Sequence, residues 1–275
     1  MPRMFSTESA KAIKADEYGY LNGIHYMAPD EVAKEYVKSN DKIQHGPLYE
    51  FYIANFFLLI KAVGTVCRWA TDACRGLCLG QYSGQAGMVK DLEHGLNNVR
   101  ESRILKTLMF FHDVQSYLNL ICLAIRQLIK KAAKLNKTLC IRLNGSSDIA
   151  WERIKIKAEG NKNIYEVFPD VQFVDYTKSK ARMLNPDRPA NLYLTFSRSE
   201  TNEQDCLELL QKGHNIAVVF GCEFPETYMG FPVINGDEHD LRHLDPKGGY
   251  VVGLKPKGRK AKADKSGFVI WKLAA

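Results

Sequence analysis

The residues best suited to chemistry are three cysteines, Cys67, Cys74 and Cys78, which form a C-x6-C-x3-C run directly after an apolar stretch. Arg68 and Arg75 flank them, and nearby cations or a bound metal favour the thiolate over the thiol. Three thiolates suit a zinc ion with one further ligand, or an iron–sulfur cluster with one open iron. The run therefore predicts a cysteine-bound metal, either zinc or iron–sulfur. The alternative is that these cysteines are merely buried or idle.

Polar side chains follow each β-rich run in the second half of the chain. The runs at 138–143, 171–176 and 191–196 end in such groups, and more follow the runs at 232–234 and 250–254. In parallel α/β architectures the active site lies beyond the carboxyl ends of the strands. We therefore expect one shared polar pocket, with ordinary turn chemistry as the alternative. The predicted substrate-binding residues are Arg142, Asn144, Lys178, Ser197, Arg198, Glu200 and Lys255.

Acidic side chains and one histidine supply the candidate catalytic groups. Asp175 lies in an otherwise apolar run, where burial without a partner would be costly. The segment 235–245 is the densest polar cluster of the chain. Its carboxylates and imidazole can provide a general base or a nucleophile, or ligands for a hard metal ion, and a salt-bridged loop is the alternative. The predicted catalytic residues are Asp148, Asp175, Asp237, His239 and Asp240.

The positive charge of the chain is unevenly distributed. The formal net charge is +7, and the stretch 255–265 alone contains six basic residues and one acid. A basic loop beside a nearly neutral body is typical of contact with phosphate groups, so a nucleic acid or nucleotide is the predicted partner. A solvated surface turn is the alternative.

The periodicity of the apolar residues indicates the elements that position these groups. From 93 to 135 they recur at spacings of three and four, which predicts one long helix or two. Shorter helices are predicted at 30–38 and 202–212, and the apolar run 51–60 is a candidate first strand. After residue 136, β-rich runs alternate with helical stretches, and this alternation predicts βαβ units with a largely parallel sheet.

The predicted fold class is α/β, a complete or partial (β/α) barrel with the long helix and a Cys-rich segment before most of the strands. An open sheet is the alternative. We expect residues 1–47 to form an N-terminal extension that is largely polar and irregular. Residues 48–275 would form a single barrel-like domain that includes the Cys-rich metal segment at 64–87 and the basic C-terminal loop at 255–265.

Composition excludes several classes of protein. The chain has 275 residues, of which 45% are hydrophobic and 25% charged, an ordinary globular balance rather than that of a disordered or fibrous protein. Seven cysteines at uneven spacings do not predict a secreted disulfide framework, so a reducing cytosol is expected. The N-terminus lacks an apolar signal segment, and the run 51–60 is too short to span a bilayer. We expect a protein of the cytoplasm.

Several motifs resemble a family of bacteriophage and prophage proteins of poorly defined function, which implies expression in a host cytoplasm. More distantly, the chain resembles phage proteins with a radical-SAM-like partial barrel, which implies an iron–sulfur cluster and S-adenosylmethionine as cofactors. Radical-SAM enzymes use C-x3-C-x2-C where this chain has C-x6-C-x3-C. The motifs that carry the resemblance are the cysteine run and the segments 142–152, 168–178, 191–200, 235–242 and 252–255.

A weaker architectural resemblance connects the chain with phage deazaguanine DNA transglycosylases, which use an aspartate nucleophile, an aspartate base and a cysteine-rich zinc site. This resemblance implies such roles for Asp148 and Asp237. The leading hypothesis is a phage-encoded barrel enzyme with a cysteine-bound metal that acts on nucleobases of DNA or on nucleotide precursors. The alternatives are a radical-SAM-like iron–sulfur enzyme acting on a small molecule or peptide, and a non-catalytic, metal-stapled protein that binds host protein or nucleic acid.

Overall fold

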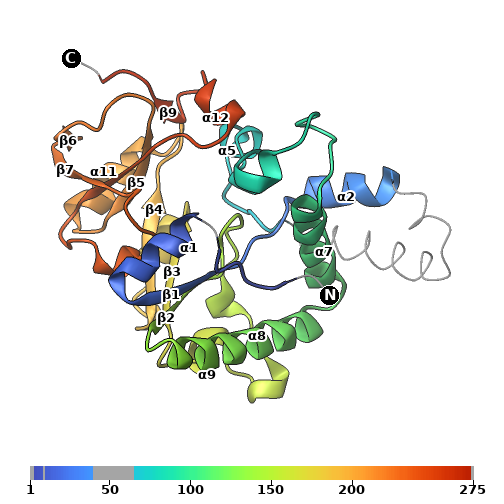
Figure 1. Ribbon diagram of the computed structural model, residues 1–275. Helices are drawn as coiled ribbons and strands as arrows, with labels where there is room; N and C mark the ends of the chain where they lie inside the picture. The colour runs from blue at the N-terminus through green and yellow to red at the C-terminus, as the bar shows by residue number, and fades with distance from the viewer. Residues whose placement is uncertain (1–2, 9, 40–64, 274–275) are drawn as a thin grey trace.

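The computed structural model describes residues 3–8, 10–39 and 65–273. The candidate strand at 51–60 lies outside these residues. The described part of the chain forms one mixed sheet with helices on its sides (Figure 1). None of the described helices is long and apolar enough to cross a membrane.

The sheet has nine strands in the order β1-β2-β3-β4-β5-β8-β7-β6, with β9 paired to the end of β5. All pairs are parallel except the short β6–β7 pair. The strands are β1 (Tyr20–Ile24), β2 (Thr138–Arg142), β3 (Gln172–Thr177), β4 (Leu192–Ser197), β5 (Ile216–Phe220), β6 (Thr227–Tyr228), β7 (Phe231–Asn235), β8 (Val251–Leu254) and β9 (Val269–Ile270).

Two long helices connect β1 to β2. The predicted helical region divides at Asp113, whose carboxylate accepts hydrogen bonds from the amides of Gln115 and Ser116 and caps the second helix. The α-helices are α1 (Ala10–Lys14), α2 (Asp30–Ser39), α5 (Asp72–Gly76), α6 (Leu79–Tyr82), α7 (Asn98–His112), α8 (Val114–Lys134), α9 (Ile164–Val167), α10 (Lys180–Met183), α11 (Glu203–Gln211) and α12 (Arg259–Lys262). Short 3-10 turns lie at η1 (Ala15–Tyr18), η2 (Gly84–Gly87), η3 (Trp151–Arg153), η4 (Lys157–Glu159) and η5 (Arg242–Leu244).

The predicted α/β class with a largely parallel sheet is confirmed. The first five strands lie side by side in chain order, as successive βαβ units require. The sheet is open: within the described ranges no strand pair joins β1 to the far edge at β6. A closed barrel is therefore not formed by these residues.

The first strand of the sheet lies in the region predicted as an irregular N-terminal extension. β1 pairs along its whole length with β2, from Tyr20 opposite Thr138 to Ile24 opposite Arg142. Gly23 is needed there because a Cβ atom would lie 2.8 Å from Leu128 Cδ1 and 2.9 Å from Ile141 Cδ1. A strand of five residues that includes asparagine and this glycine has no clear alternation, which explains why periodicity did not reveal it.

The two faces of the sheet differ in what covers them. On one face Ile141, Phe173 and Phe196 pack in the main core with α8 and its neighbours. On the other face, Cys140 and Val174 pack with Ala15, in the N-terminal turn, and with Leu241. Because side chains alternate along each strand, this difference decides which face each candidate site residue occupies.

Candidate functional site

The cysteine segment lies between β1 and α7 and contacts the loop that follows β2. The thiol of Cys67 is 3.7 Å from the carbonyl oxygen of Ser146, to which it donates. The amide of Asp148 donates to the carbonyl of Val66 at 2.8 Å. Gly80 approaches the same loop so closely that a Cβ atom would lie 2.7 Å from the Cβ of Ser146. The cysteines are therefore held at the carboxyl edge of the sheet.

Glu200, which follows β4, fixes the helix that carries Cys74. Its carboxylate accepts from the hydroxyl of Thr71 at 2.9 Å and from the amide of Ala73 at 3.3 Å. Thr71 in turn caps α5 by accepting from the amide of Cys74 at 3.3 Å. The predicted role of Glu200 in substrate binding stays a prediction, and its contacts show that it positions the cysteine segment.

Lys178, directly after β3, is a cation close to Cys74 and Cys67. Burial opposes its charge, but the negative charges of Cys74 and Asp148 outweigh burial and raise the pKa of Lys178. Its ammonium donates to the hydroxyl of Ser197 at 3.4 Å and lies 5.5 Å from the ring centre of Phe268. Three successive strand ends thus meet here, as the sequence predicted for Lys178 and Ser197.

The three thiols influence one another. Burial raises the pKa of Cys67, and negative charge on Cys78 and Cys74 raises it further. Burial and Cys74 likewise raise the pKa of Cys78, while the amides of Gly80 and Gln81 oppose the shift. All seven cysteines are unpaired. The shifts show that the three thiols share one electrostatic environment.

The three thiols suit more than one metal group. Among the described residues, no three Cys, His, Asp or Glu side chains are arranged so that they could hold one metal ion. Three thiolates suit a zinc ion with one further ligand or an iron–sulfur cluster with one open iron. The choice between zinc and an iron–sulfur cluster stays a prediction.

Asp148, a predicted catalytic residue, is fully engaged in hydrogen bonds. Oδ1 accepts from Arg182 at 2.8 Å, and Oδ2 accepts from the hydroxyl of Thr177 at 3.1 Å and the amide of Lys178 at 2.9 Å. Arg182 also binds both carboxylate oxygens of Glu152, at 2.7 and 3.0 Å. Burial raises the pKa of Asp148, which Arg182 opposes. This buried ion-pair network fixes the loops after β2 and β3.

Asp175 is buried and is held by Asn144. The amide of Asn144 donates to Oδ1 at 2.8 Å, and its side-chain Nδ2 donates to Oδ2 at 3.1 Å. Burial raises the pKa of Asp175 to about 7, although Arg142 and Arg182 oppose the shift. A carboxyl that changes protonation near neutral pH is a common feature of functional sites.

Asp240 lies on the other face of the sheet from Asp175. Its carboxylate accepts from Arg142 at 2.8 Å and from the hydroxyl of Tyr176 at 3.2 Å, and the guanidinium of Arg142 stacks 4.5 Å from the Tyr176 ring centre. Because Asp175 and Tyr176 are consecutive strand residues, they point to opposite faces. The expected single pocket is therefore divided: Asp240 pairs with Arg142 on one face and Asp175 is held by Asn144 on the other, with Arg142 near enough to influence both carboxyl groups.

Other predicted residues hold loops together. Asp237 accepts from the amide of Lys255 at 2.8 Å, and the ammonium of Lys255 donates to the Cys222 carbonyl. The ring Nδ1 of His239 accepts from the Leu241 amide at 3.2 Å. Arg198 donates to the carbonyls of residues 267 and 268, at 2.6 and 3.1 Å. None of these contacts reaches the cysteine segment at 64–87. The predicted site residues that they hold elsewhere are Asp237, His239, Lys255 and Arg198.

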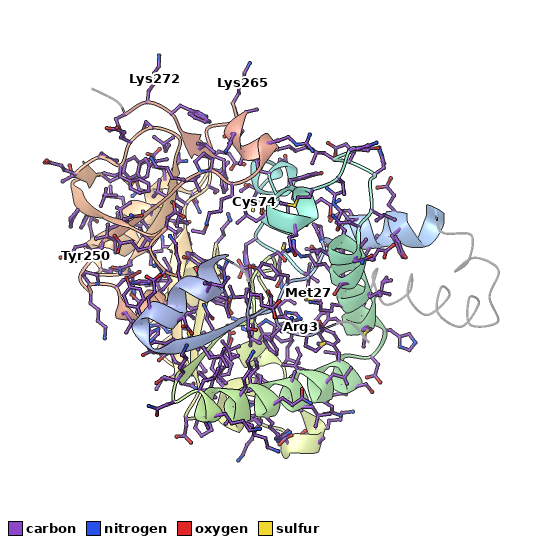
Figure 2. The ribbon with its side chains drawn as sticks, in the orientation of Figure 1. Arg3, Met27, Cys74, Tyr250, Lys265 and Lys272 are labelled. Carbon is purple, nitrogen blue, oxygen red and sulfur yellow. The ribbon has the colours of Figure 1, made fainter. Side chains whose placement is uncertain are left out.

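The basic stretch packs partly on the cysteine segment. The ammonium of Lys260 lies 3.9 Å from the ring centre of Tyr82, within the cysteine segment. Just beyond that segment, Lys260 pairs with Glu93 and Arg259 donates to the carbonyl of Val89 at 2.9 Å. Lys262 and Lys265 are exposed and have no such partner among the described residues. Figure 2 shows Lys265 projecting from this end of the molecule. Only part of the stretch is thus available to contact a phosphate backbone.

Buried cations on α7 were missed at the sequence level. Arg100 is 1% exposed and donates to four backbone carbonyls between residues 81 and 95. Arg103 donates to the carbonyl of Gly80 and stacks on Tyr26. Both arginines anchor the cysteine segment to the helix. Their spacing of three on an apolar helix is the signal that could have identified them.

A buried histidine also escaped prediction. His25 follows β1, with Nδ1 2.9 Å from the carbonyl of Leu143 and Nε2 2.7 Å from the hydroxyl of Tyr117. Burial lowers the pKa of His25 to about 3, so the ring is neutral. Nδ1 therefore donates to the carbonyl and Nε2 accepts from Tyr117. The histidine fastens the end of β1 to the loop after β2 and to α8.

Comparison with known proteins identifies a family. The model of a protein family described as gene product 88 matches residues 31–272. This match fits the predicted phage or prophage family of poorly defined function. No curated protein and no solved structure matches the chain.

Proposed function

The chain belongs to the gene product 88 family, and we propose that it is an iron–sulfur enzyme that uses S-adenosylmethionine to modify a nucleic acid or nucleotide. Cys67, Cys74 and Cys78 would hold the cluster. The observation that carries the proposal is the gathering of these three coupled thiols beside Lys178 at the carboxyl edge of a parallel sheet. Active sites of parallel α/β proteins lie at this edge.

The number of thiols suits a cluster. Three thiolates leave one iron of a cluster open. When bound, such a cluster supplies an electron to S-adenosylmethionine. Lys178 would offset the negative charge of the thiolates and, with Ser197 at 3.4 Å, would offer donors to an anionic group of the substrate.

The predicted base exchange by an aspartate nucleophile has weaker support. Asp148 accepts three hydrogen bonds, and Arg182 neutralises it. Asp237 is tied to the Lys255 amide and to Lys257, 3.2 Å away. A nucleophilic carboxylate must instead be free to attack. We therefore place the chemistry at the cysteines rather than at the aspartates.

The nucleic-acid part of the proposal rests on the C-terminal segment. Lys262 and Lys265 are exposed, and Trp271 is 40% exposed next to Gly221. Lysines neutralise phosphates, and an exposed aromatic ring can stack on a base. Because α12 packs on the cysteine segment, a strand bound here would run close to the proposed cluster.

Anaerobic reconstitution with iron and sulfide tests the cluster. We expect a brown protein with visible absorbance, and loss of that absorbance in Cys67→Ser, Cys74→Ser and Cys78→Ser. Cys222→Ser is the matched control, because this half-buried cysteine lies elsewhere and contacts the carbonyl of Ile270. A colourless protein with one zinc per chain would overturn the proposal.

Two further measurements test the cofactor and the substrate. The reconstituted, reduced protein should release 5′-deoxyadenosine from S-adenosylmethionine, and Lys178→Met should reduce this turnover. Binding of single-stranded DNA should weaken with salt, by about one log unit per phosphate contact for each decade of salt. At a given salt concentration, the variant in which Gln replaces Lys262 and Lys265 should bind single-stranded DNA more weakly than the wild type does. A coloured protein with no turnover and salt-independent binding would leave a metal-stapled binding protein as the better description.

A further inference from the structure

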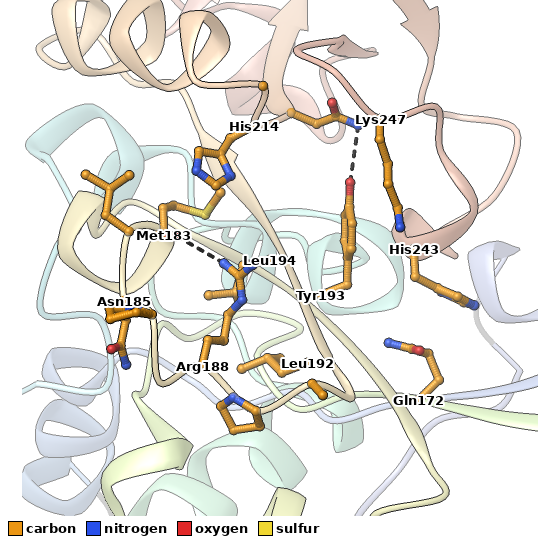
Figure 3. Close-up of a pocket in the computed structure, with 16 residues that line it drawn as sticks. Gln172, Met183, Asn185, Arg188, Leu192, Tyr193, Leu194, His214, His243 and Lys247 are labelled. Carbon is orange, nitrogen blue, oxygen red and sulfur yellow. Dashed lines mark hydrogen bonds between the residues drawn. The ribbon is translucent and has the colours of Figure 1, made fainter.

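A cavity lies at the opposite edge of the sheet from the cysteines. It has a volume of about 680 Å³ and opens at the amino ends of β3, β4 and β5. Gln172 and Leu192, which begin β3 and β4, line it, as do residues 213–215 before β5 (Figure 3). Its volume is that of a typical small-molecule site.

The lining of this cavity carries positive charge without any acid. Four of its side chains contain basic nitrogen atoms, Arg188, His214, His243 and Lys247, and none of the sixteen lining residues is Asp or Glu. In the view of Figure 3, Arg188 and His214 lie on one side of Tyr193 and Lys247 and His243 on the other. Such a lining favours an anion.

Arg188 and His214 have unused hydrogen-bonding capacity. Arg188 donates through one terminal nitrogen to the carbonyl of Met183 at 3.0 Å, and no carboxylate in the described part of the chain pairs with it. Burial lowers the pKa of Arg188. Burial, Arg188 and Lys212 lower the pKa of His214. Burial is the largest cause of both shifts, so both side chains are partly withdrawn from water at the cavity.

His243 adds a buried atom without a partner. Its Nε2 lies 3.2 Å from the hydroxyl of Tyr20, while its Nδ1 is buried and has no hydrogen-bond partner among the described residues. Burial lowers the pKa of His243 to about 4, so the ring is neutral near pH 7. A buried polar atom without a partner is costly unless a water or a ligand satisfies it.

The apolar part of the lining suits a flat or hydrophobic group. Leu192, Leu194, Pro189 and Tyr193 line the cavity together with the cationic groups, with Leu192 and Leu194 on the opposite face of β4 from Tyr193. The hydroxyl of Tyr193 accepts from Asn215 at 3.3 Å, which fixes the ring. A fixed aromatic ring between cations offers a stacking surface beside anion-binding groups.

We propose that this cavity binds a phosphorylated small molecule the size of a mononucleotide, with its ring system against Tyr193 and with Arg188 and Lys247, on either side of that ring, supplying the positive charge that attracts its phosphate. This site is separate from the cysteine site and would serve a ligand other than the one that reacts there.

Calorimetric titration with AMP, adenosine and inorganic phosphate tests this site. We expect AMP to bind and adenosine to bind at least ten-fold more weakly, because each charge-assisted hydrogen bond is worth about ten-fold or more in affinity. Arg188→Gln and Lys247→Gln should each weaken AMP binding by about ten-fold or more. Saturating AMP should raise the melting temperature of the wild-type protein.

Control variants separate this site from the cysteine site. Lys265→Gln, at the opposite edge, and Cys74→Ser should bind AMP as the wild type does. If Arg188→Gln misfolds, the exposed Lys247 still provides the test. The proposal fails if neither AMP nor phosphate binds, if adenosine binds as tightly as AMP, or if Lys247→Gln binds AMP normally. The proposal also fails if a DNA oligomer binds more tightly than AMP and Lys247→Gln weakens that DNA binding. The cavity would then be part of a surface for a polynucleotide.

Discussion

Replacing Asp175 by Asn should change how the stability of the protein depends on pH. The folded-state pKa of this carboxyl is raised to about 7, from an ordinary value of 3.8. Between these values the folded protein binds more protons than the unfolded chain, so ionisation of Asp175 lowers stability as the pH rises. A shift of about three pKa units corresponds to about 4 kcal/mol over the full range. Between pH 5 and pH 8 the ionisation of Asp175 should lower the free energy of unfolding of the wild-type protein by about 2.5 kcal/mol.

The variant keeps the size of the side chain but cannot ionise. Asn144 cannot rotate its amide to suit the new group, because its oxygen already accepts from the amide of Ile149 and the indole of Trp151. The NH₂ group of the substituted side chain must therefore face a donor, at a constant cost of about 1–3 kcal/mol. We expect Asp175→Asn to be less stable than the wild type at pH 5. Between pH 5 and pH 8 the free energy of unfolding of the variant should rise by about 2.5 kcal/mol relative to that of the wild type.

Urea unfolding at several pH values, followed by far-ultraviolet circular dichroism, measures this difference. His25 titrates with the opposite sign, because its folded-state pKa of about 3 makes stability fall as the pH drops below 6.5. That contribution is common to both proteins and cancels in the difference. Asp170→Asn, at an exposed position, is the matched control. A difference between Asp175→Asn and wild type that stays constant from pH 5 to pH 8 would refute the reasoning.

Three further predictions concern the supports of the site. Arg100→Ala should lower the free energy of unfolding by about 3 kcal/mol or more, measured by urea unfolding, because four carbonyls lose their donor. Glu200→Ala should leave circular dichroism unchanged but speed tryptic cleavage after Arg75, because α5 loses its contacts through Thr71 and Ala73. Gly145→Ala should lower the melting temperature and cost about 1–3 kcal/mol, because its Cβ would lie 2.6 Å from the His25 carbonyl oxygen.

The longer strands after residue 136 could be predicted because each is a short apolar run between turn residues, whereas the two-residue strands β6 and β9 were not predicted. The predicted runs at 138–143, 171–176 and 191–196 agree with β2, β3 and β4 to within one residue at either end. β1 could not be predicted in the same way, since its burial depends on Gly23, which lets the Leu128 and Ile141 side chains approach. That requirement is a tertiary contact and leaves no periodic pattern.

The candidate site could be predicted only in part. The sequence predicted Lys178 and Ser197 at the ends of neighbouring strands. In the structure Nζ of Lys178 lies 3.4 Å from the hydroxyl oxygen of Ser197. The sequence could not predict which face each side chain occupies, so Asp175 and Asp240 were expected in one pocket. The partner of Asp240 is Arg142, 98 residues away. Pairings over such distances are set by strand order and register rather than by local sequence.

Lys178 differs from the other buried cations at the carboxyl edge of the sheet in its partners. Asp148 is neutralised by Arg182, and Asp240 by Arg142. Lys178 instead faces Cys74 and the hydroxyl of Ser197, and it forms no salt bridge with a carboxylate in the described part of the chain. A buried ammonium is costly without an anion nearby. Thiolates, which a cluster requires, could supply the negative charge that offsets the Lys178 ammonium. The protonated state of Lys178 and the ionised state of the cysteines should therefore stabilise each other.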